Sequence, residues 1–226
     1  RSIRAVGFDM DYTLASYVSE TFEALAHAAT VEKLVAAFGY PAAPLRALAF
    51  DPHYMARGLV IDKARGNVLK VDRHRYVKLA HHGFAPLARD ARVATYNAAA
   101  ARPAFDDEAA FAMIDTLFSL AEAHLFMALV ELKDAGGLEG MAGGAAKSYA
   151  EIYRDVRGAV DLCHRDGSIK REVAADPAMF IHPDPGLVPL LRTLRAAGKR
   201  VFLATNSLWD YTNVVMSWWV EKIDVL

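Results

Sequence analysis

The chain has 226 residues, of which 54% are hydrophobic and 23% are charged, and this length and composition exclude a disordered protein. The formal net charge of −1 argues against a basic surface for a nucleic-acid polymer. The single cysteine, Cys163, excludes an intramolecular disulfide framework and a zinc site of several cysteines. A lone thiol is also typical of a reducing compartment.

The N-terminus and the hydrophobic segments of the chain indicate in which compartment the protein is located. No apolar run approaches the roughly 20 residues that a membrane helix requires, so we expect no membrane partner. The chain begins at Arg1 rather than at Met and shows no signal-peptide pattern, so we expect a trimmed chain. Together with the lone thiol, these observations predict a cytoplasmic protein. A removed organellar leader is the open alternative.

Three elements are predicted in the first third of the chain. Residues 3–8 are apolar and are followed directly by polar residues, which is typical of a short buried strand. Residues 19–38 are rich in Ala and Glu and predict a helix that ends before Pro41. Two β-rich runs flank a turn between residues 58 and 71, so this segment predicts a β-hairpin.

The rest of the chain predicts mainly helices. Apolar residues spaced three and four apart across 107–134 predict one long helix or two shorter ones, and another helix is predicted over 146–164. A helix over 187–197 leads into a second buried strand over 200–204. Because a strand followed by a polar turn occurs twice around a helical block, we predict an α/β fold with a parallel sheet.

Both polar turns carry residues suited to chemistry. Ligands bind beyond the carboxyl ends of parallel strands, so Asp9 and Thr205-Asn206-Ser207 are expected to face one pocket. Asp9 and Asp11 are two apart in an extended segment, so one carboxylate can attack while the other transfers a proton beside a hard cation. The alternative for each turn is a helix cap, which for the second turn does not exclude a phosphate site.

These turns resemble two motifs of the haloacid dehalogenase (HAD) superfamily. The first motif is similar to residues 7–14 (GFDMDYTL), and the second is similar to residues 203–207 (LATNS). Further segments resemble the cytosolic purine 5′-nucleotidases, which prefer IMP and GMP, in this order along the chain: Arg57-Gly58-Leu59-Val60, Gly66-Asn67 with Leu69-Lys70-Val71-Asp72, and Asp115-Thr116-Leu117-Phe118. The resemblance covers residues 3–216.

The resemblance implies a fold and a mechanism. The fold would be an α/β HAD-like Rossmannoid core, a parallel sheet flanked by helices, over 1–104 and 177–226, incomplete at the C-terminus, with a mostly helical cap over 105–176. Asp9 would be the nucleophile that forms an aspartyl phosphate, and Asp11 would be the general acid and base. Asp9 and the backbone carbonyl of Asp11 would hold Mg²⁺. Thr205, Asn206 and Ser207 would bind the phosphate. Phosphoryl transfer depends mainly on positioning and charge neutralisation, which these groups can supply.

A third group of residues is predicted to read the substrate's base. Arg157, Asp161 and His164 are spaced to lie on one helical face. The alternative is an exposed Arg–Asp pair that stabilises its own helix. The resemblance implies that these three residues and Lys170 belong to the nucleotide site, and that Phe84 stacks on the base. The alternative for Phe84 is ordinary core packing.

Several departures from the family pattern bear on activity. In the family, Asn is common at the position of Ala85. Asp is common at the position of Leu208, directly after the Thr-Asn-Ser motif. The later lysine motif and the acidic pair that completes the Mg²⁺ site do not occur before residue 226, so we expect this chain alone to be inactive. The family implies a purine nucleoside monophosphate as substrate, a homo-oligomer, and phosphotransfer as a side reaction. The alternative is a truncated or degenerate relative that acts as a non-catalytic subunit of a larger assembly.

Overall fold

The computed structural model describes residues 3–98, 103–139, 141 and 147–221, and it confirms an α/β fold with parallel and antiparallel sheets. Contacts divide the chain into two compact units. Unit 1 comprises Arg1–Phe22 and Gly167–Leu226, and unit 2 comprises Glu23–Asp166. The predicted division into a core over 1–104 and 177–226 and a cap over 105–176 stays a prediction.

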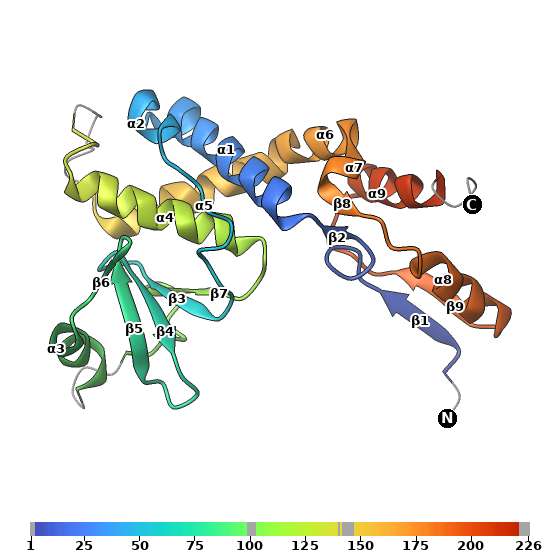
Figure 1. Ribbon diagram of the computed structural model, residues 1–226, viewed down its shortest axis with the longest axis horizontal. Helices are drawn as coiled ribbons and strands as arrows, with labels where there is room; N and C mark the ends of the chain where they lie inside the picture. The colour runs from blue at the N-terminus through green and yellow to red at the C-terminus, as the bar shows by residue number, and fades with distance from the viewer. Residues whose placement is uncertain (1–2, 99–102, 140, 142–146, 222–226) are drawn as a thin grey trace. The chain divides into compact units, whose positions relative to one another are not determined.

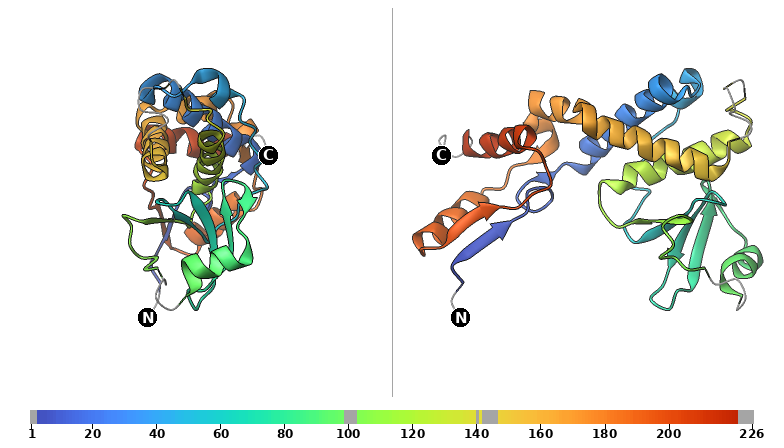
Figure 2. Two further views of the ribbon diagram at one scale, coloured as in Figure 1. Left: turned by 90° about the vertical axis from the view of Figure 1, so that its left-hand side faces the viewer. Right: turned by 180° about the vertical axis from the view of Figure 1, so that it is seen from behind.

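Unit 1 is built around a pair of parallel strands. Strand β1 pairs with β9 in register, with Ala5 opposite Arg200 and Phe8 opposite Leu203 (Figures 1 and 2). A second, antiparallel pair joins β2 to β8. The elements of this unit are β1 (Ala5–Phe8), β2 (Ser16–Tyr17), α6 (Ser168–Ala175), α7 (Pro177–Phe180), β8 (Ile181–His182), α8 (Leu187–Ala196), β9 (Arg200–Leu203) and α9 (Trp209–Glu221).

Unit 2 contains a five-stranded antiparallel sheet in the order β6-β5-β4-β3-β7, and α4 packs against α5 beside it (Figure 1). The strands are β3 (Leu59–Asp62), β4 (Asn67–Val71), β5 (Val77–His82), β6 (Ala85–Pro86) and β7 (Phe111–Ile114). The helices are α1 (Ser19–Phe38), whose first turn belongs to unit 1, α2 (Ala42–Arg46), α3 (Arg89–Arg92), the π-helix η1 (Val93–Asn97), α4 (Ser119–Asp134) and α5 (Tyr149–Asp166).

Most predicted elements are confirmed, and one is wrong in part. The helix over 19–38 and the hairpin over 58–71 are present, as are the helices near 149–166 and 187–196. Residue 146, where one helix was predicted to begin, lies outside the described residues. Phe111–Ile114, predicted to be helical, is instead a strand. The spacing of Phe111 and Ile114 fits either element, but here the two side chains lie on opposite faces of the sheet and enter separate hydrophobic clusters.

The core of unit 2 covers both faces of its sheet. Leu125, Phe126 and Leu129 of α4 are fully buried against one face. Tyr96 of η1 is buried in the cluster on the other face, together with Leu69. Burial of each such side chain stabilises the fold by about 1.5–3 kcal/mol, so these layers are the main source of stability in this unit.

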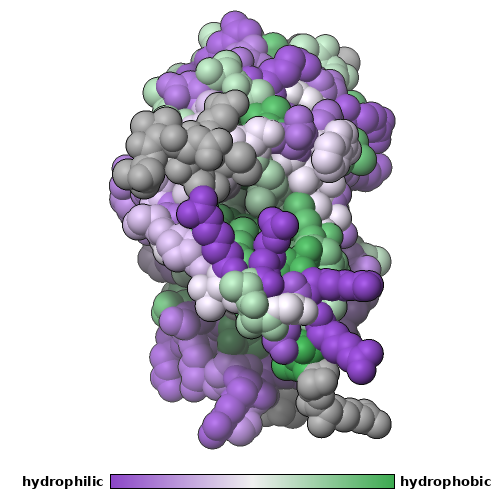
Figure 3. Space-filling view, turned by 90° about the vertical axis from the view of Figure 1, so that its right-hand side faces the viewer, coloured by the Kyte–Doolittle hydropathy of each residue, from purple (hydrophilic) through white to green (hydrophobic). Residues whose placement is uncertain are grey.

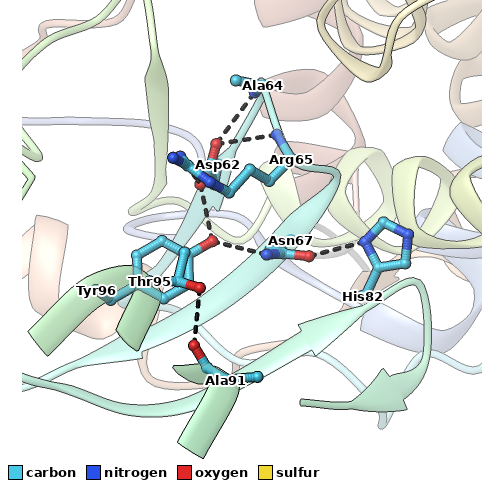
Figure 4. A network of polar contacts seen from close by, with 8 residues as sticks. All are labelled: Asp62, Ala64, Arg65, Asn67, His82, Ala91, Thr95 and Tyr96. Atoms are coloured by element: carbon cyan, nitrogen blue, oxygen red, sulfur yellow. Dashed lines mark hydrogen bonds and ion pairs between the residues drawn. The ribbon is translucent and has the colours of Figure 1, made fainter. Parts of the chain in front are cut away.

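A buried polar network fixes the hairpin turn of unit 2 (Figure 4). Asp62 Oδ1 accepts from the backbone N–H groups of Ala64 and Arg65, both at 3.1 Å. The Tyr96 hydroxyl donates to Asp62 Oδ2 at 2.8 Å and accepts from Asn67 Nδ2 at 2.7 Å. Because each buried polar group here has a partner, the network holds η1 on the sheet and offsets the cost of removing these groups from water.

The parallel pair of unit 1 is far less covered. Every residue of β1 and β9 is half-buried or exposed, and the Phe202 side chain is 54% exposed. Figure 3 shows hydrophobic surface lying between hydrophilic side chains on the face it presents.

Among the helices that the structure describes, none is both long and apolar enough to cross a lipid bilayer.

Candidate active site

The two polar turns lie side by side in unit 1. The backbone N–H of Ala204 donates to the carbonyl of Phe8 at 2.8 Å, which extends the β1–β9 pairing to the last residue of each strand. Asp9 and Thr205 therefore follow neighbouring parallel strands at the same edge. The prediction that the two turns lie next to each other is confirmed, and the prediction that they face one pocket stays a prediction.

A tight loop after Asp9 sets the direction of Asp11. The carbonyl of Met10 accepts from the N–H groups of Thr13, Leu14 and Ala15 at 2.8–3.2 Å, and Tyr12 adopts a left-handed backbone with φ 57°. The loop is visible as a closed curl after β1 (Figure 1). It returns the chain past Asp11, so that β2 passes beside that residue.

Asp11 joins the two turns through its carboxylate. Ser207 Oγ donates to Asp11 Oδ2 at 2.9 Å, and the Tyr17 hydroxyl donates to Asp11 Oδ1 at 2.6 Å. Both carboxylate oxygens are thus held by O–H donors, one from each side. Hydrogen bonds to an ionised oxygen are stronger than neutral ones, so they fix the orientation of this side chain.

The other residues of the two turns are more open. Asp9 is exposed, and its Oδ1 accepts from the backbone N–H of Met10 at 2.8 Å. Thr205 Oγ1 accepts from the backbone N–H of Ser207 at 3.0 Å, and Asn206 is exposed. The Thr205 turn precedes α9, which begins at Trp209, and the Thr205 hydroxyl bonds within the turn rather than to a backbone N–H of the helix. The start of a helix favours an anion.

Two buried tyrosines lie behind Asp11. The hydroxyls of Tyr17 and Tyr211 are 2.9 Å apart, and the two side chains are 3% and 6% exposed. Lys170 lies next to them, with its ammonium 5.6 Å from the centre of the Tyr211 ring. Burial raises the pKa of Tyr211 to about 12, with the Asp11 carboxylate adding to the rise. Burial, Tyr211 and Asp11, in that order, raise the pKa of Tyr17 further above its usual value.

Arg157 and Asp161 of α5 form an ion pair in unit 2. Arg157 Nη2 lies 2.6 Å from Asp161 Oδ1, and Nη1 lies 2.8 Å from Oε2 of the buried Glu122. The Tyr153 hydroxyl donates to the other Glu122 oxygen at 2.8 Å. Burial lowers the pKa of Arg157, but Glu122 and Asp161 together outweigh it and hold that pKa above its usual range. The guanidinium is therefore charged and held in one orientation, and its side chain is still 49% exposed.

Phe84 lies at the edge of an aromatic cluster in unit 2. Its ring centre is 5.0 Å from that of His124 and 5.1 Å from that of Tyr54, and its backbone N–H donates to Glu131 at 3.0 Å. His124 in turn contacts His27 and Phe50. Phe84 is half-buried, so it packs against the core and also presents part of its ring to solvent.

Comparison with known proteins places this chain in a family. The model of the 5′ nucleotidase family matches residues 1–225. The chain belongs to the 5′-nucleotidase family. It is 28% identical over 238 residues to a 5′-nucleotidase domain-containing protein of Dictyostelium discoideum, covering 99% of this chain and 39% of that protein.

Two mammalian relatives give the same result. The chain is 27% identical to 5′-nucleotidase domain-containing protein 2 of Rattus norvegicus over 93% of its own length and 38% of that protein. It is 26% identical to the Homo sapiens protein of the same name, over 94% of its length and 41% of that protein. The chain thus spans about two fifths of the length of these curated relatives.

Within this family member, the predicted site residues fall into two groups. Asp9, Asp11, Lys170 and the turn Thr205-Asn206-Ser207 belong to unit 1, while Phe84, Arg157, Asp161 and His164 belong to unit 2. The structure brings Asp11 together with Ser207, and Arg157 together with Asp161. His164 is exposed on the last turn of α5. That both groups serve one substrate stays a prediction.

The residues that sequence reasoning missed are the two tyrosines. Tyr17 is six positions after Asp11, and Tyr211 is in the first turn of α9. No spacing rule links these positions, because the curl after β1 and the start of α9 bring them together. The one available signal was a polar hydroxyl within otherwise apolar short segments, which is too common to identify a site.

The oxygen ligands of unit 1 suit Mg²⁺ in part. Mg²⁺ is usually held by one or two carboxylates together with other oxygens and water, and the exposed Asp9 carboxylate and the Asp11 backbone carbonyl are the two oxygen donors that would hold it here. Within the described part of the chain there is no group of three or more His, Cys, Asp or Glu side chains that would form a complete metal cage. These donors fit part of a Mg²⁺ coordination shell, and binding of Mg²⁺ stays a prediction.

Proposed function

We propose that the complete protein containing this chain is a Mg²⁺-dependent phosphoric monoester hydrolase that converts purine nucleoside 5′-monophosphates to nucleoside and phosphate. The observation that carries this proposal is the hydrogen bond from Ser207 to Asp11, which joins two polar turns at the ends of parallel neighbouring strands. Membership of the 5′-nucleotidase family supports the same reaction class.

The proposed chemistry has two steps on one pair of carboxylates. In the first, an oxygen of Asp9 attacks phosphorus, the bond from phosphorus to the ribose oxygen breaks, and Asp11 gives its proton to that oxygen. In the second, Asp11 takes a proton from water, which attacks the phosphorus of the aspartyl phosphate and restores the Asp9 carboxylate. Such division of roles between nucleophile and acid–base group is the usual way to activate a weak nucleophile.

The turn before α9 is proposed to bind the phosphate. Thr205, Asn206 and Ser207 supply hydroxyl, amide and backbone donors at the start of a helix of 13 residues, where the helix dipole favours negative charge. Asp9 and Asp11 would hold Mg²⁺, which when bound would neutralise charge on the phosphoryl oxygens. The parallel pairing of β1 with β9, which ends next to both turns, supports this assignment.

Unit 2 is proposed to recognise the base. Arg157 and Asp161 offer donors and acceptors that match a purine edge, and the half-exposed Phe84 ring offers a stacking surface. His164 and Lys170 are proposed to complete the nucleotide site. IMP and GMP are the proposed substrates, and Ala85 removes a polar contact that would support a strict preference for these two nucleotides. A cytoplasmic homo-oligomer with nucleoside phosphotransferase activity as a side reaction follows from the same family resemblance.

The test uses the complete protein with GMP or IMP and Mg²⁺, and it measures released phosphate. We expect turnover that requires the metal and that is lost in Asp9→Asn, because an amide oxygen is a far weaker nucleophile than a carboxylate. Asp106→Asn is the matched control, since this exposed carboxylate lies in unit 2 and its loss leaves turnover unchanged. Absence of phosphate release from the complete protein, or unchanged turnover in Asp9→Asn, contradicts the proposal.

A further inference from the structure

Phe84, whose ring is proposed to stack on the base, lies at the tip of a tight hairpin. Strand β5 ends at His82, β6 begins at Ala85, and these two residues pair with each other. Gly83 and Phe84 are therefore the two central residues of the turn. Gly83 has a φ of 53°, in the left-handed region, while the φ of Phe84 is not positive. A glycine at the first central position is typical of a type II′ hairpin turn.

The last turn of α4 lies directly against this hairpin turn. A Cβ at position 83 would lie 2.5 Å from Cγ of Glu131 and 3.4 Å from the backbone oxygen of Met127. The missing side chain of Gly83 thus lets the hairpin backbone approach the helix closely, and the Glu131 side chain occupies the space. Any other residue at position 83 would have a strained φ and would displace Glu131.

Two carboxylates from this end of α4 bind the residues on either side of Gly83. Oε1 of Glu131 accepts from the backbone N–H of Phe84 at 3.0 Å. Oδ2 of Asp134 lies 2.8 Å from Nε2 of His82. The N–H of the second central residue in a two-residue turn takes no part in the strand pairing, so Glu131 supplies an acceptor that this group would otherwise find only in water.

The same helix also holds the ring of Phe84. The ring centre is 5.0 Å from that of His124, which lies about two turns before Glu131 on α4. On another side the ring meets Tyr54 at 86°. His124 is 3% exposed and Tyr54 is 43% exposed, so the Phe84 ring connects the core to the surface. Both the backbone and the ring of Phe84 are therefore fixed against α4.

We propose that Gly83 and Glu131 are positioning residues that hold Phe84 in the orientation in which it stacks on the purine base. This inference rests on the proposed function, in which unit 2 recognises the base. A ring that is already in place binds a base more tightly than one that must be ordered on binding. Neither Gly83 nor Glu131 touches the substrate, because each acts through Phe84.

The test measures kcat and KM of the complete protein with Mg²⁺ for two substrates. These are GMP and ribose 5-phosphate, which has the sugar phosphate but no base. Phe84→Ala sets the scale and should raise KM for GMP by roughly 5- to 100-fold. Glu131→Ala should raise it by roughly threefold or more with kcat changed by less than about twofold, because binding rather than chemistry is affected. Both constants for ribose 5-phosphate should stay unchanged.

Three further variants complete the experiment. Glu131→Gln keeps an oxygen acceptor for the N–H of Phe84 and should bring KM for GMP to within about twofold of the wild type. Glu32→Ala is the matched control and should change nothing, because Glu32 is also an exposed helical carboxylate of unit 2 but accepts from Arg46. Gly83→Ala should raise KM for GMP, and its effect should not multiply with that of Glu131→Ala, since both act through Phe84.

The outcomes separate this inference from the proposed function. If the wild type neither binds GMP in calorimetry nor releases phosphate from it, both fail. If it binds GMP without releasing phosphate, the proposed reaction fails, and an unchanged dissociation constant in Glu131→Ala then overturns the inference as well. If the wild type is active but Glu131→Ala keeps its KM for GMP, only the positioning role is overturned.

Two other results would also overturn the positioning role. An equal rise of KM for ribose 5-phosphate in Glu131→Ala would show that the effect does not concern the base. A loss in Glu131→Gln as large as that in Glu131→Ala would show that the acceptor for the N–H of Phe84 is not what matters. If Gly83→Ala does not fold, the variants of the exposed Glu131 decide.

Discussion

The two units hold their important residues in different ways. In unit 2 the central strands are buried on both faces, and α4 contributes Leu125, Phe126 and Leu129 to a fully enclosed layer. In unit 1 no residue of β1 or β9 is fully buried, yet the turns at the ends of these strands carry the proposed chemistry. The reactive turns therefore rest on a lightly covered pair of strands.

The difference shows what holds the side chains of the proposed site in place. Parallel strands are normally covered on both faces, so their burial usually makes the strand ends rigid. In this chain the side chain of Asp11 is fixed by hydrogen bonds from Tyr17 and Ser207, and Tyr17 is itself enclosed by aromatic rings. Within this chain, which spans about two fifths of the length of its curated relatives, local hydrogen bonding and aromatic packing hold the Asp11 side chain in place.

The largest expected difference between the units is in the free energy of unfolding that is lost when an aromatic ring is removed. Phe126→Ala removes a fully buried ring from unit 2 and should lower the free energy of unfolding by about 3–5 kcal/mol. Phe202→Ala removes a half-exposed ring from unit 1 and should lower it by less than about 1 kcal/mol. Urea denaturation followed by circular dichroism measures both, and equal losses would contradict the contrast between the units.

The next effect concerns the histidines in the aromatic cluster of unit 2. Burial, and less strongly His124, lowers the pKa of His27 from its usual 6.5 to about 4. The unfolded chain binds the proton at a higher pH than the folded chain, so this group costs stability as pH falls from 6.5 to 4, by up to about 3 kcal/mol.

Replacing His27 by Phe tests this directly. The new ring can keep the stacking on Phe50, whose ring centre lies 4.8 Å away, but it takes up no proton. The variant should lose less stability than the wild type between pH 7 and pH 4.5 in urea denaturation. Parallel pH dependence of the two proteins would show that His27 is not the titrating group.

A third prediction separates base recognition in unit 2 from chemistry in unit 1. In the complete protein, Arg157→Ala should raise KM for GMP by roughly tenfold or more and change turnover of a small artificial phosphate ester little. The variant also leaves the buried Glu122 with Tyr153 as its hydrogen-bond donor, so its stability is measured alongside. Equal losses with both substrates would remove Arg157 from base recognition.

The smallest effect is expected at an exposed ion pair. Arg46 forms two hydrogen bonds of 2.7 Å to Glu32, but both side chains are more than half exposed. Surface pairs of this kind add little to stability because water screens them. Arg46→Ala should therefore leave the midpoint of urea denaturation unchanged. A clear shift of the midpoint would mean that surface ion pairs, and not only core packing, contribute to the stability of unit 2.

Predictability from sequence varied between elements for physical reasons. The helix over 19–38 and the hairpin over 58–71 were predicted correctly, because each is encoded by local spacing and turn residues. The strand Phe111–Ile114 was mistaken for helix, because four apolar residues contain too little periodicity to separate the two. The adjacency of Asp9 and Thr205 was predicted from strand order alone and is confirmed by the β1–β9 register.

The sequence by itself determined the family, the α/β class and the two polar turns, because motifs, turn residues and strand ends are properties of short segments. The tertiary structure decided which groups surround those turns. Tyr17 and Tyr211 are 194 positions apart and meet only because a curl after β1 and the first turn of α9 converge on Asp11. Such a contact depends on the path of the whole chain, so no local pattern in the sequence contains it.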